Sequence, residues 1–441
     1  MAGIFKAYDI RGIYGDTLTE DVAFRIGRAF ATFLGCKTVA VGRDMRPHSG
    51  PLFEALARGL TLHGVEVLDI GVCSTPMTYF ATGKAETDAG IMITASHNPG
   101  EWNGFKLCRE QAVPISGDTG IADIEKIVVE QAFAPEAETP GQVRSRADLV
   151  EAYVEHIRSF ADLKRPVRAV VDYANGMGIV EGRVLEGLIE VDPLFDRLDG
   201  SFPNHEANPL KLETLEPAAE RLRRGGFDFG VAFDGDADRA GFLDERGEPI
   251  PMDMITALIA RILLRDRPGA PIFYDLRSSW SVREVIEEAG GKPMMSRVGH
   301  AFIKQQMRDA DALFAGELSG HYYFRENYFT ESAALAVVLV ANLVSASEAP
   351  LSGLIRPLCR YHASGEINSR VEDTDAVFAR LLERYGDGRV IRMDGVSVEF
   401  EDWWFNVRAS NTEPLIRLNL EAKTREEMET RRDEVLGLIR G

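Results

Sequence analysis

Apolar stretches of strand length alternate with amphipathic stretches of helical length over most of the chain, a pattern typical of α/β layers with largely parallel sheets. Three places share one local pattern, in which an apolar strand runs into an aspartate, a polar turn and then a helix. Because they are spaced by roughly a domain length, they indicate three copies of a related α/β unit. These places are TVAVGRDMRP (38–47), RAVVDYANGMG (168–178) and PIFYDLRSSW (271–280).

The segment 364–441 has a different pattern, in which short strands and a helix precede a closing helix. Thr424, followed three residues later by Glu427, forms a capping-box pattern that predicts where the closing helix starts. We therefore expect a small α+β domain here. Its predicted strands are 366–371, 396–400, 404–408 and 416–421, and its first predicted helix contains Phe378, Leu381, Leu382 and Tyr385.

Breaks in these patterns predict where the domains divide. A chain of 441 residues is too long for a single core, and the Pro- and Glu-rich stretch 134–142 reads as a linker. Further boundaries are expected near 245–251 and 360–365. The sequence thus predicts α/β domains at 1–145, 146–247 and 248–363 and the α+β domain at 364–441.

Composition and charge narrow the classes of function. A hydrophobic content of 45% with 27% charged residues is that of a folded protein, and the net charge of −19 argues against nucleic acid or a membrane as the partner. The four cysteines show no C-x-x-C spacing, so no zinc site or disulfide framework is indicated. The N-terminus lacks a signal-peptide core and no apolar run approaches the ~20 residues of a membrane span, so we expect a cytoplasmic protein.

The stretch ITASHNPGEWNGFK (93–106) begins as a buried strand and then changes character. The Asn-Pro pair biases the chain to turn, which places Ser96 on a loop at the end of the strand, where residues do chemistry more often than packing. No G-x-S-x-G pattern surrounds Ser96, so it is not the nucleophile of a typical serine hydrolase. We expect His97 to point away from Ser96, as neighbours do on an extended chain.

A second unusual stretch, FGVAFDGDADRAG (229–241), ends an apolar strand in three alternating aspartates, Asp234, Asp236 and Asp238. Alternation lets them face one side of an extended chain, where they would repel one another unless a divalent cation lay between them. A calcium-binding EF-hand loop is excluded because Arg239 stands where that loop needs glycine. An open site with only oxygen ligands suits Mg²⁺ held together with a phosphate oxygen.

Two further stretches offer groups that bind phosphates or sugars. NVRASNTEPLIR (406–417) presents Arg408, Ser410, Asn411 and Thr412 in a tight loop, the kind of donor set that holds a phosphate dianion. AGELSGHYYF (315–324) places polar side chains between glycines, where they can bind sugar hydroxyls, although the same pattern is equally typical of an ordinary loop. Together with Ser96 and the acidic cluster, these stretches indicate phosphoryl transfer.

The motifs TASHNP (94–99), DGDADR (234–239), GELSGH (316–321) and RASNTEP (408–414), in this order, resemble the four signatures of the α-D-phosphohexomutase superfamily. The match is closest to its bacterial phosphomannomutase/phosphoglucomutase branch, and YDIRG near the start and NGFK after the serine extend it over nearly the whole chain. This resemblance implies four domains around a central cleft: three related α/β domains with mixed, largely parallel sheets and a C-terminal α+β domain.

The resemblance also implies a role for each matching residue. Ser96 would carry a phosphoryl group, and Asp234, Asp236 and Asp238 would hold Mg²⁺ with a phosphoserine oxygen. The catalytic set would be Ser96, Lys106, Arg239, His321 and Arg11, with Lys106 and His321 as candidates for acid and base work. Substrate would be bound by Tyr8, His300, Glu317, Ser319, Arg408, Ser410, Asn411 and Thr412.

The implied reaction interconverts mannose 6-phosphate and mannose 1-phosphate through phosphoserine and a hexose 1,6-bisphosphate, which also activates the enzyme, with glucose phosphates as further substrates. Alternatives are a phosphoglucomutase, an aspartate-nucleophile phosphotransferase using Asp234, and a non-catalytic sugar-phosphate sensor on this scaffold. Leu318 and the segment 330–332 depart from the common family pattern, which leaves the sugar preference open. We expect hexose phosphates as ligands and a monomer or homodimer.

Overall fold

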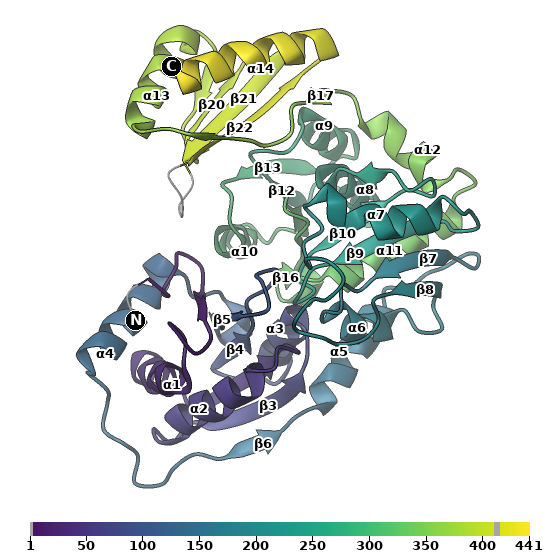
Figure 1. The fold of residues 1–441 in the computed structure, drawn as a ribbon. Coiled ribbons are helices and arrows are strands. Elements are labelled where there is room, and N and C mark those ends of the chain that lie inside the picture. Colours follow the sequence, from purple (N-terminus) through teal and green to yellow (C-terminus); the bar gives the residue numbers. More distant parts are fainter. Residues whose placement is uncertain (1–2, 410–414) are drawn as a thin grey trace.

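The computed structural model describes residues 3–409 and 415–441, and within these ranges the strands form four sheets. The sheets follow one another in chain order. In Figure 1 the N-terminal domain lies at the lower left and the C-terminal domain at the top, with the two middle domains side by side between them on the right. This arrangement agrees with the predicted fold class.

The first sheet has the order β1-β5-β4-β2-β3-β6. Its central strand β2 pairs in parallel with β3 and β4, and β5 and β1 then add antiparallel strands beyond β4. Its helices include α1 and α2. They pack so closely at Gly27 that a Cβ there would lie 2.4 Å from the Leu56 carbonyl oxygen. The elements are β1 (Ile10–Ile13), α1 (Glu20–Leu34), β2 (Thr38–Arg43), α2 (Ser49–Thr61), β3 (Glu66–Val72), α3 (Thr75–Lys84), β4 (Ala89–Ile93), β5 (Trp102–Arg109), α4 (Ile121–Glu130) and β6 (Val143–Ser145).

The second and third sheets repeat the centre of the first. In each, a central strand (β7 or β12) has a parallel neighbour on both sides and two antiparallel strands beyond one of them, in the orders β11-β10-β9-β7-β8 and β13-β12-β14-β15-β16. The prediction of three related units is therefore confirmed.

The second sheet belongs to α5 (Asp148–Arg158), β7 (Arg168–Asp172), α6 (Gly178–Glu181), β8 (Glu190–Leu194), α7 (Leu212–Leu222), β9 (Phe229–Phe233), β10 (Ala240–Leu243) and β11 (Pro249–Ile250). The third belongs to α8 (Met252–Asp266), β12 (Pro271–Asp275), α9 (Trp280–Glu288), β13 (Lys292–Ser296), α10 (His300–Asp309), β14 (Phe314–Gly316), β15 (Tyr322–Phe324), β16 (Thr330–Glu331), α11 (Ala333–Ala346) and α12 (Leu351–Ile355).

The aspartate that ends each central strand has a common structural role. The carboxylates of Asp44, Asp172 and Asp275 each accept a hydrogen bond from the backbone N–H two residues later, at 3.1, 2.8 and 2.8 Å. Such a bond stabilises a turn that leads the chain off the strand. The shared sequence pattern thus marks a shared turn at the end of each central strand.

The C-terminal domain is an antiparallel sheet in the order β17-β22-β21-β20-β19, with β18 also paired to β22, as the α+β prediction requires. Thr424 caps the closing helix and accepts a hydrogen bond from the Glu427 N–H, as predicted. The predicted strands did not include β17 or β19, each of which is only two or three residues long. The elements are β17 (His362–Ala363), β18 (Ile367–Arg370), α13 (Thr374–Tyr385), β19 (Arg389–Ile391), β20 (Val396–Glu399), β21 (Trp403–Ala409), β22 (Leu415–Ala422) and α14 (Arg425–Arg440).

One large hydrophobic core joins parts of the first three domains, whereas the C-terminal domain has a core of its own. Helix α11 lies in the shared core and is buried along nearly its whole length. Among the described residues no single helix is long and apolar enough to cross a membrane; α11 passes that test only together with the segment Leu351–Leu358, which lies at 98° to it. A helix that is apolar on all sides and buried is a core helix.

Candidate active site

Ser96 follows β4 on a short loop, as predicted, and its hydroxyl faces the acidic cluster. The Ser96 Oγ donates a hydrogen bond to Asp234 Oδ2 at 2.9 Å, and the residue is 1% exposed. Its φ angle of 52° is in the left-handed region, which is rare for a residue other than glycine and is held only where the surroundings impose it. A buried serine with a strained backbone and a carboxylate partner is a candidate for chemistry.

The expected orientation of His97 was wrong. Its Nδ1 lies 3.2 Å from Ser96 Oγ, because the left-handed backbone at Ser96 turns the two side chains to the same side. Burial, reinforced by Arg239 and Arg11, holds the pKa of His97 well below its usual range, so the imidazole is neutral. His97 is therefore part of the site, although the sequence pattern had predicted that it points away from Ser96.

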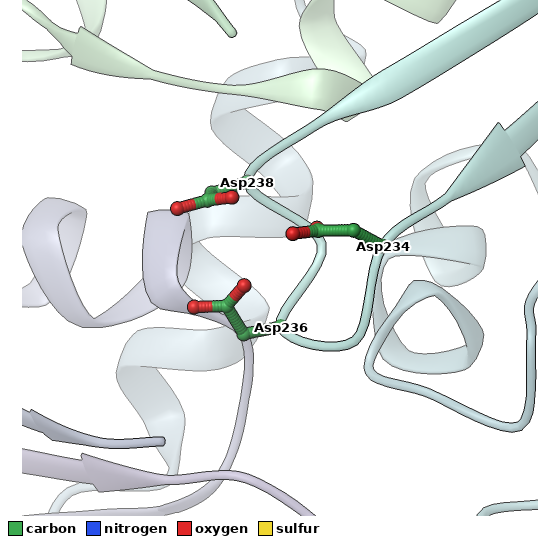
Figure 2. A group of neighbouring side chains, drawn as sticks. All are labelled: Asp234, Asp236 and Asp238. Atoms are coloured by element: carbon green, nitrogen blue, oxygen red, sulfur yellow. The ribbon is translucent and has the colours of Figure 1, made fainter. Parts of the chain in front are cut away.

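The three aspartates of the β9–β10 loop converge on one point (Figure 2), and their ligand oxygens lie within 4.8 Å of one another. The segment is a turn with Ala237 at a φ of 58° and not the extended chain that the alternation predicted. The aspartates converge as expected, but for a different reason. Burial, together with the charges of Asp238 and Asp236, raises the pKa of Asp234 well above its usual value.

These carboxylates fit a divalent metal ion. Within the described chain, the buried oxygen Asp236 Oδ1 has no hydrogen-bond partner, which is costly unless something else satisfies it. The donor set is entirely oxygen and highly charged, as Mg²⁺ or Ca²⁺ requires. The chemistry of its donors therefore fits the cluster to a divalent metal ion.

Lys106 neutralises part of this cluster from the neighbouring strand β5. Its ammonium donates to Asp236 Oδ2 at 2.6 Å and also contacts Asp238. Burial would lower the pKa of Lys106, but the two carboxylates outweigh burial and hold it above its usual value. Thr75, at the start of α3, donates to the same Asp236 oxygen at 2.5 Å and had not been predicted, since nothing in its local sequence points to the cluster.

Arg239 and His321 link the acidic cluster to the GELSGH loop. The Arg239 Nε lies 3.2 Å from His321 Nε2, and His321 lies 3.4 Å from Asp238 and 3.1 Å from Glu317. The Ser319 hydroxyl is 2.8 Å from His321 Nδ1. Burial would lower the pKa of His321, yet the neighbouring carboxylates raise it to about 9, so the imidazole is charged at neutral pH.

Above these groups lies a cleft of about 330 Å³ that all four domains line. Tyr8 comes from the first domain, Arg239 from the second, His300 from the third and Arg408 from the fourth. A larger cavity of about 600 Å³, between α8 and α11, is lined by aliphatic and charged or polar side chains in equal numbers and contains none of the predicted site residues. The predicted residues that line the cleft are Tyr8, Arg239, His300, Glu317, Ser319, His321 and Arg408.

Three arginines in this cleft meet one carboxylate. Arg408 and Arg417 of the C-terminal domain lie 2.9 and 3.2 Å from Glu366, and Arg277 of the third domain lies 3.7 Å from it. Burial would raise the pKa of Glu366, but these arginines outweigh it and hold the pKa below its usual value. Arg277 and Arg417 had not been predicted. The predicted phosphate ligands Ser410, Asn411 and Thr412 lie outside the described residues.

Arg11, on β1, supports the serine loop. It forms an ion pair with Asp9 at 2.7 Å and donates to the Asn98 side-chain oxygen at 2.5 Å and to the Ala95 carbonyl at 3.4 Å. Its guanidinium thus contacts the loop on both sides of Ser96. The predicted residues Ser96, Lys106, Arg239, His321 and the three aspartates form one connected network, which Arg11 supports through the backbone and Asn98 of the serine loop.

Four family models match the chain in order, over residues 2–135, 151–247, 251–361 and 366–438. They are described as the alpha/beta/alpha domains I, II and III and the C-terminal domain of phosphoglucomutase/phosphomannomutase. The chain belongs to the phosphoglucomutase/phosphomannomutase family. The recognition from the four motifs is confirmed, while the division at residues 145, 247 and 363 stays a prediction.

Relatives in this family are similar over nearly their whole length. The phosphomannomutase of Escherichia coli K12 is 42% identical over 95% of this chain and 94% of its own. The phosphohexose mutases of Xanthomonas campestris strain B100 are 42% identical over 99% of both chains. A crystal structure of a phosphoglucomutase/phosphomannomutase family protein from Burkholderia thailandensis covers 99% of this chain and 96% of its own with a TM-score of 0.92 at 34% identity.

Proposed function

We propose that the protein is a phosphomannomutase that interconverts mannose 6-phosphate and mannose 1-phosphate and also acts on glucose phosphates. The observation that carries this proposal is the buried Ser96 hydroxyl, 2.9 Å from a three-aspartate metal cluster, beneath a cleft lined by arginines. The names of the relatives, phosphomannomutase and phosphohexose mutases, support the same reaction and substrate class.

The proposed reaction runs through a phosphoserine at position 96 and a hexose 1,6-bisphosphate, which also primes unphosphorylated enzyme. The bond from phosphorus to Ser96 Oγ breaks as a bond to the free sugar hydroxyl forms, and the hydroxyl proton passes to the protein. The bisphosphate then turns over in the cleft and returns its other phosphate to Ser96. Lys106 and His321 are the proposed groups for proton transfer; because both are protonated at neutral pH, either one first donates a proton to the oxygen that phosphorus leaves and then accepts the sugar proton.

The surrounding residues supply charge and position. Asp234, Asp236 and Asp238 would hold Mg²⁺, which when bound neutralises the phosphoryl oxygens during transfer. A phosphoserine carries about −2 charge, which a divalent ion balances in a buried site. Tyr8, His300, Glu317 and Ser319 would bind the sugar. Arg408, with the predicted Ser410, Asn411 and Thr412, would hold the phosphate that does not react.

Ser96→Ala tests the proposal directly. We expect it to abolish both turnover and the mass increase of one phosphate that wild-type protein shows after incubation with a hexose 1,6-bisphosphate. The exposed Ser159→Ala is the matched control and should retain both. Phosphate found on Asp234 as a hydroxylamine-labile acyl phosphate would instead favour an aspartate nucleophile, and phosphorylation without turnover would favour a sensor.

Metal removal and substrate choice complete the test. Exhaustive treatment with EDTA should stop the reaction, and Mg²⁺ should restore it better than Ca²⁺, because Mg²⁺ imposes compact octahedral geometry. Full activity after chelation would overturn the metal assignment. Initial rates with mannose 1-phosphate and glucose 1-phosphate decide between phosphomannomutase and phosphoglucomutase as the main activity.

A further inference from the structure

A single buried guanidinium binds the backbone of the loop that carries Ser96. Arg46 follows β2, and its side chain is fully buried. One terminal nitrogen, Nη2, donates to the carbonyl oxygens of Ser96 and Asn98 at 2.9 and 2.7 Å. The other, Nη1, donates to the carbonyls of Pro99 and Trp102 at 2.7 and 3.0 Å.

The fifth donor, Arg46 Nε, is held by Asp44 Oδ2 at 3.1 Å, so all five N–H groups of this guanidinium are engaged. Asp44 is itself fixed by the Ser49 hydroxyl at 2.6 Å. Its backbone N–H bonds the Ile93 carbonyl at 3.0 Å, at the last residue of the strand that leads to the serine. The orientation of the guanidinium is therefore set by the same strand end that it braces.

The second domain closes this arrangement. The Phe202 ring lies over the Arg46 guanidinium, with its centroid 5.1 Å from the central carbon. A Cβ at Gly235 would lie 2.3 Å from the Ser96 carbonyl oxygen, so the loop of Asp234 and Asp236 packs against the carbonyl that Arg46 binds. The backbone of Ser96 is thus fixed between Arg46 and the loop of Asp234 and Asp236.

We propose that Arg46 is a positioning residue for phosphoryl transfer: by binding four carbonyls of the 96–102 loop, it holds Ser96 in its left-handed conformation with Oγ directed at the metal cluster. The inference rests on the proposed function of Ser96 as the phosphoryl carrier. Arg46 contacts the backbone alone at Ser96 and is absent from the lining of the cleft, so it acts on the nucleophile and not on the sugar. A planar fork with five fixed donors suits four carbonyls, whereas an ammonium does not.

The test compares Arg46→Lys and Arg46→Met with wild type in a steady-state assay and in a rapid-quench measurement of Ser96 phosphorylation by glucose 1,6-bisphosphate. Misplacing a reacting atom by about 1 Å can cost roughly 100-fold in rate. We expect kcat and the phosphorylation rate to fall by about that factor, with KM changed less than about threefold. Lys, which keeps the charge but not the fork, should restore little of the loss.

Asp44→Asn provides a second variant in case Arg46→Met does not fold, since it keeps the guanidinium and removes only its charged anchor. It should lower the phosphorylation rate by an intermediate factor and leave KM unchanged. A merely structural role predicts lowered thermal stability with a normal phosphorylation rate in the folded fraction, or full rescue by Lys, and either result would overturn the inference. Wild-type protein that shows no phosphoserine at all would refute the proposed function and the inference with it, whereas normal phosphorylation of the folded Arg46 variants would refute the inference alone.

Discussion

Glu181 is a buried carboxyl at the point where three domains meet. It accepts hydrogen bonds from Ser74 of the first domain and from Tyr153 of the second, and the Tyr153 hydroxyl is also 2.7 Å from Ser332 of the third. Burial raises the pKa of Glu181 to about 7, although the two hydrogen bonds act in the opposite direction. The protonated form is thus the one that the folded protein favours.

This shift predicts a pH-dependent effect of Glu181→Gln. A carboxyl whose pKa is raised on folding from 4.5 to about 7 gives stability that is present below pH 4.5 and lost as the pH rises through 7. Relative to the variant, the wild type should therefore lose up to about 3 kcal/mol of unfolding free energy between pH 4.5 and 8. Urea unfolding of both proteins at the two pH values measures this; an equal difference at both would contradict it.

Arg408→Ala should raise KM for every hexose phosphate tested, in both reaction directions, because the proposed phosphate that it binds is common to all of them. Loss of a charge-assisted hydrogen bond costs roughly 1.5–3 kcal/mol, about ten- to a hundredfold in affinity. Glu366→Gln is the matched control: it removes the carboxylate that occupies Arg408, so KM should not rise. A KM effect confined to one sugar would assign Arg408 to sugar recognition instead.

Helix α11 is buried both at its N-terminal cap and along its length. Ser332 caps it by accepting the Leu335 N–H, and the Ser332 hydroxyl also meets Tyr153. By contrast, Thr424 caps the exposed start of α14 with one hydrogen bond to its side chain. The two caps are the same motif in opposite environments.

Replacing both caps should therefore give unequal losses. Ser332→Ala should lower the unfolding free energy by about 2 kcal/mol, the upper end for a cap, because a buried partner is also lost. Thr424→Ala should cost about 1 kcal/mol or less. Denaturant unfolding of the two variants measures the difference, and equal losses would show that burial of the cap is irrelevant.

At the scale of elements, the sequence carries what is local. The strand-then-aspartate pattern identifies β2, β7 and β12 because the carboxylate bonds a backbone N–H two residues away. The roles of Arg46, Arg277 and Arg417 could not be predicted in the same way, since the groups that place them in the site, the carbonyls of the 96–102 loop and the Glu366 carboxylate, lie far along the chain. His97 was misjudged because a left-handed φ at Ser96 is imposed by tertiary contacts. The site residues within the motifs could be located because the family resemblance assigns a role to each of them, which hydrophobic periodicity does not.

At the scale of the whole molecule, the buried clusters predict two cooperative units, one formed by the three α/β domains and one by the C-terminal domain. The largest buried cluster runs from Ala40 to Leu358 and includes side chains of all three α/β domains. The cluster of the C-terminal domain runs from Val377 to Ile439 and is separate. The Trp280 backbone N–H donates to Glu421 across the two units at 3.0 Å, and within the C-terminal domain the Trp404 indole donates to the same carboxylate at 3.0 Å.

Calorimetry should accordingly resolve two unfolding transitions in the metal- and substrate-free protein. Leu335→Ala, in the shared core, should lower the temperature of the larger transition, and Leu418→Ala, in the C-terminal core, that of the smaller one. Each substitution removes a buried leucine and should cost roughly 2–5 kcal/mol. A single transition that both variants shift equally would show that the four domains unfold as one unit.

The separate core of the C-terminal domain also makes it an exchangeable module. A chimaera that takes residues 366–441 from a relative would import a different grip on the distant phosphate while leaving Ser96 and its aspartates in their native setting. The junction must keep Glu366 matched to Arg277 and Glu421 matched to the Trp280 backbone, since these contacts cross from one unit to the other. Domain exchange should therefore alter how tightly the distant phosphate is held, while the proposed sugar-binding residues and the phosphoryl-transfer groups of the other domains stay unchanged.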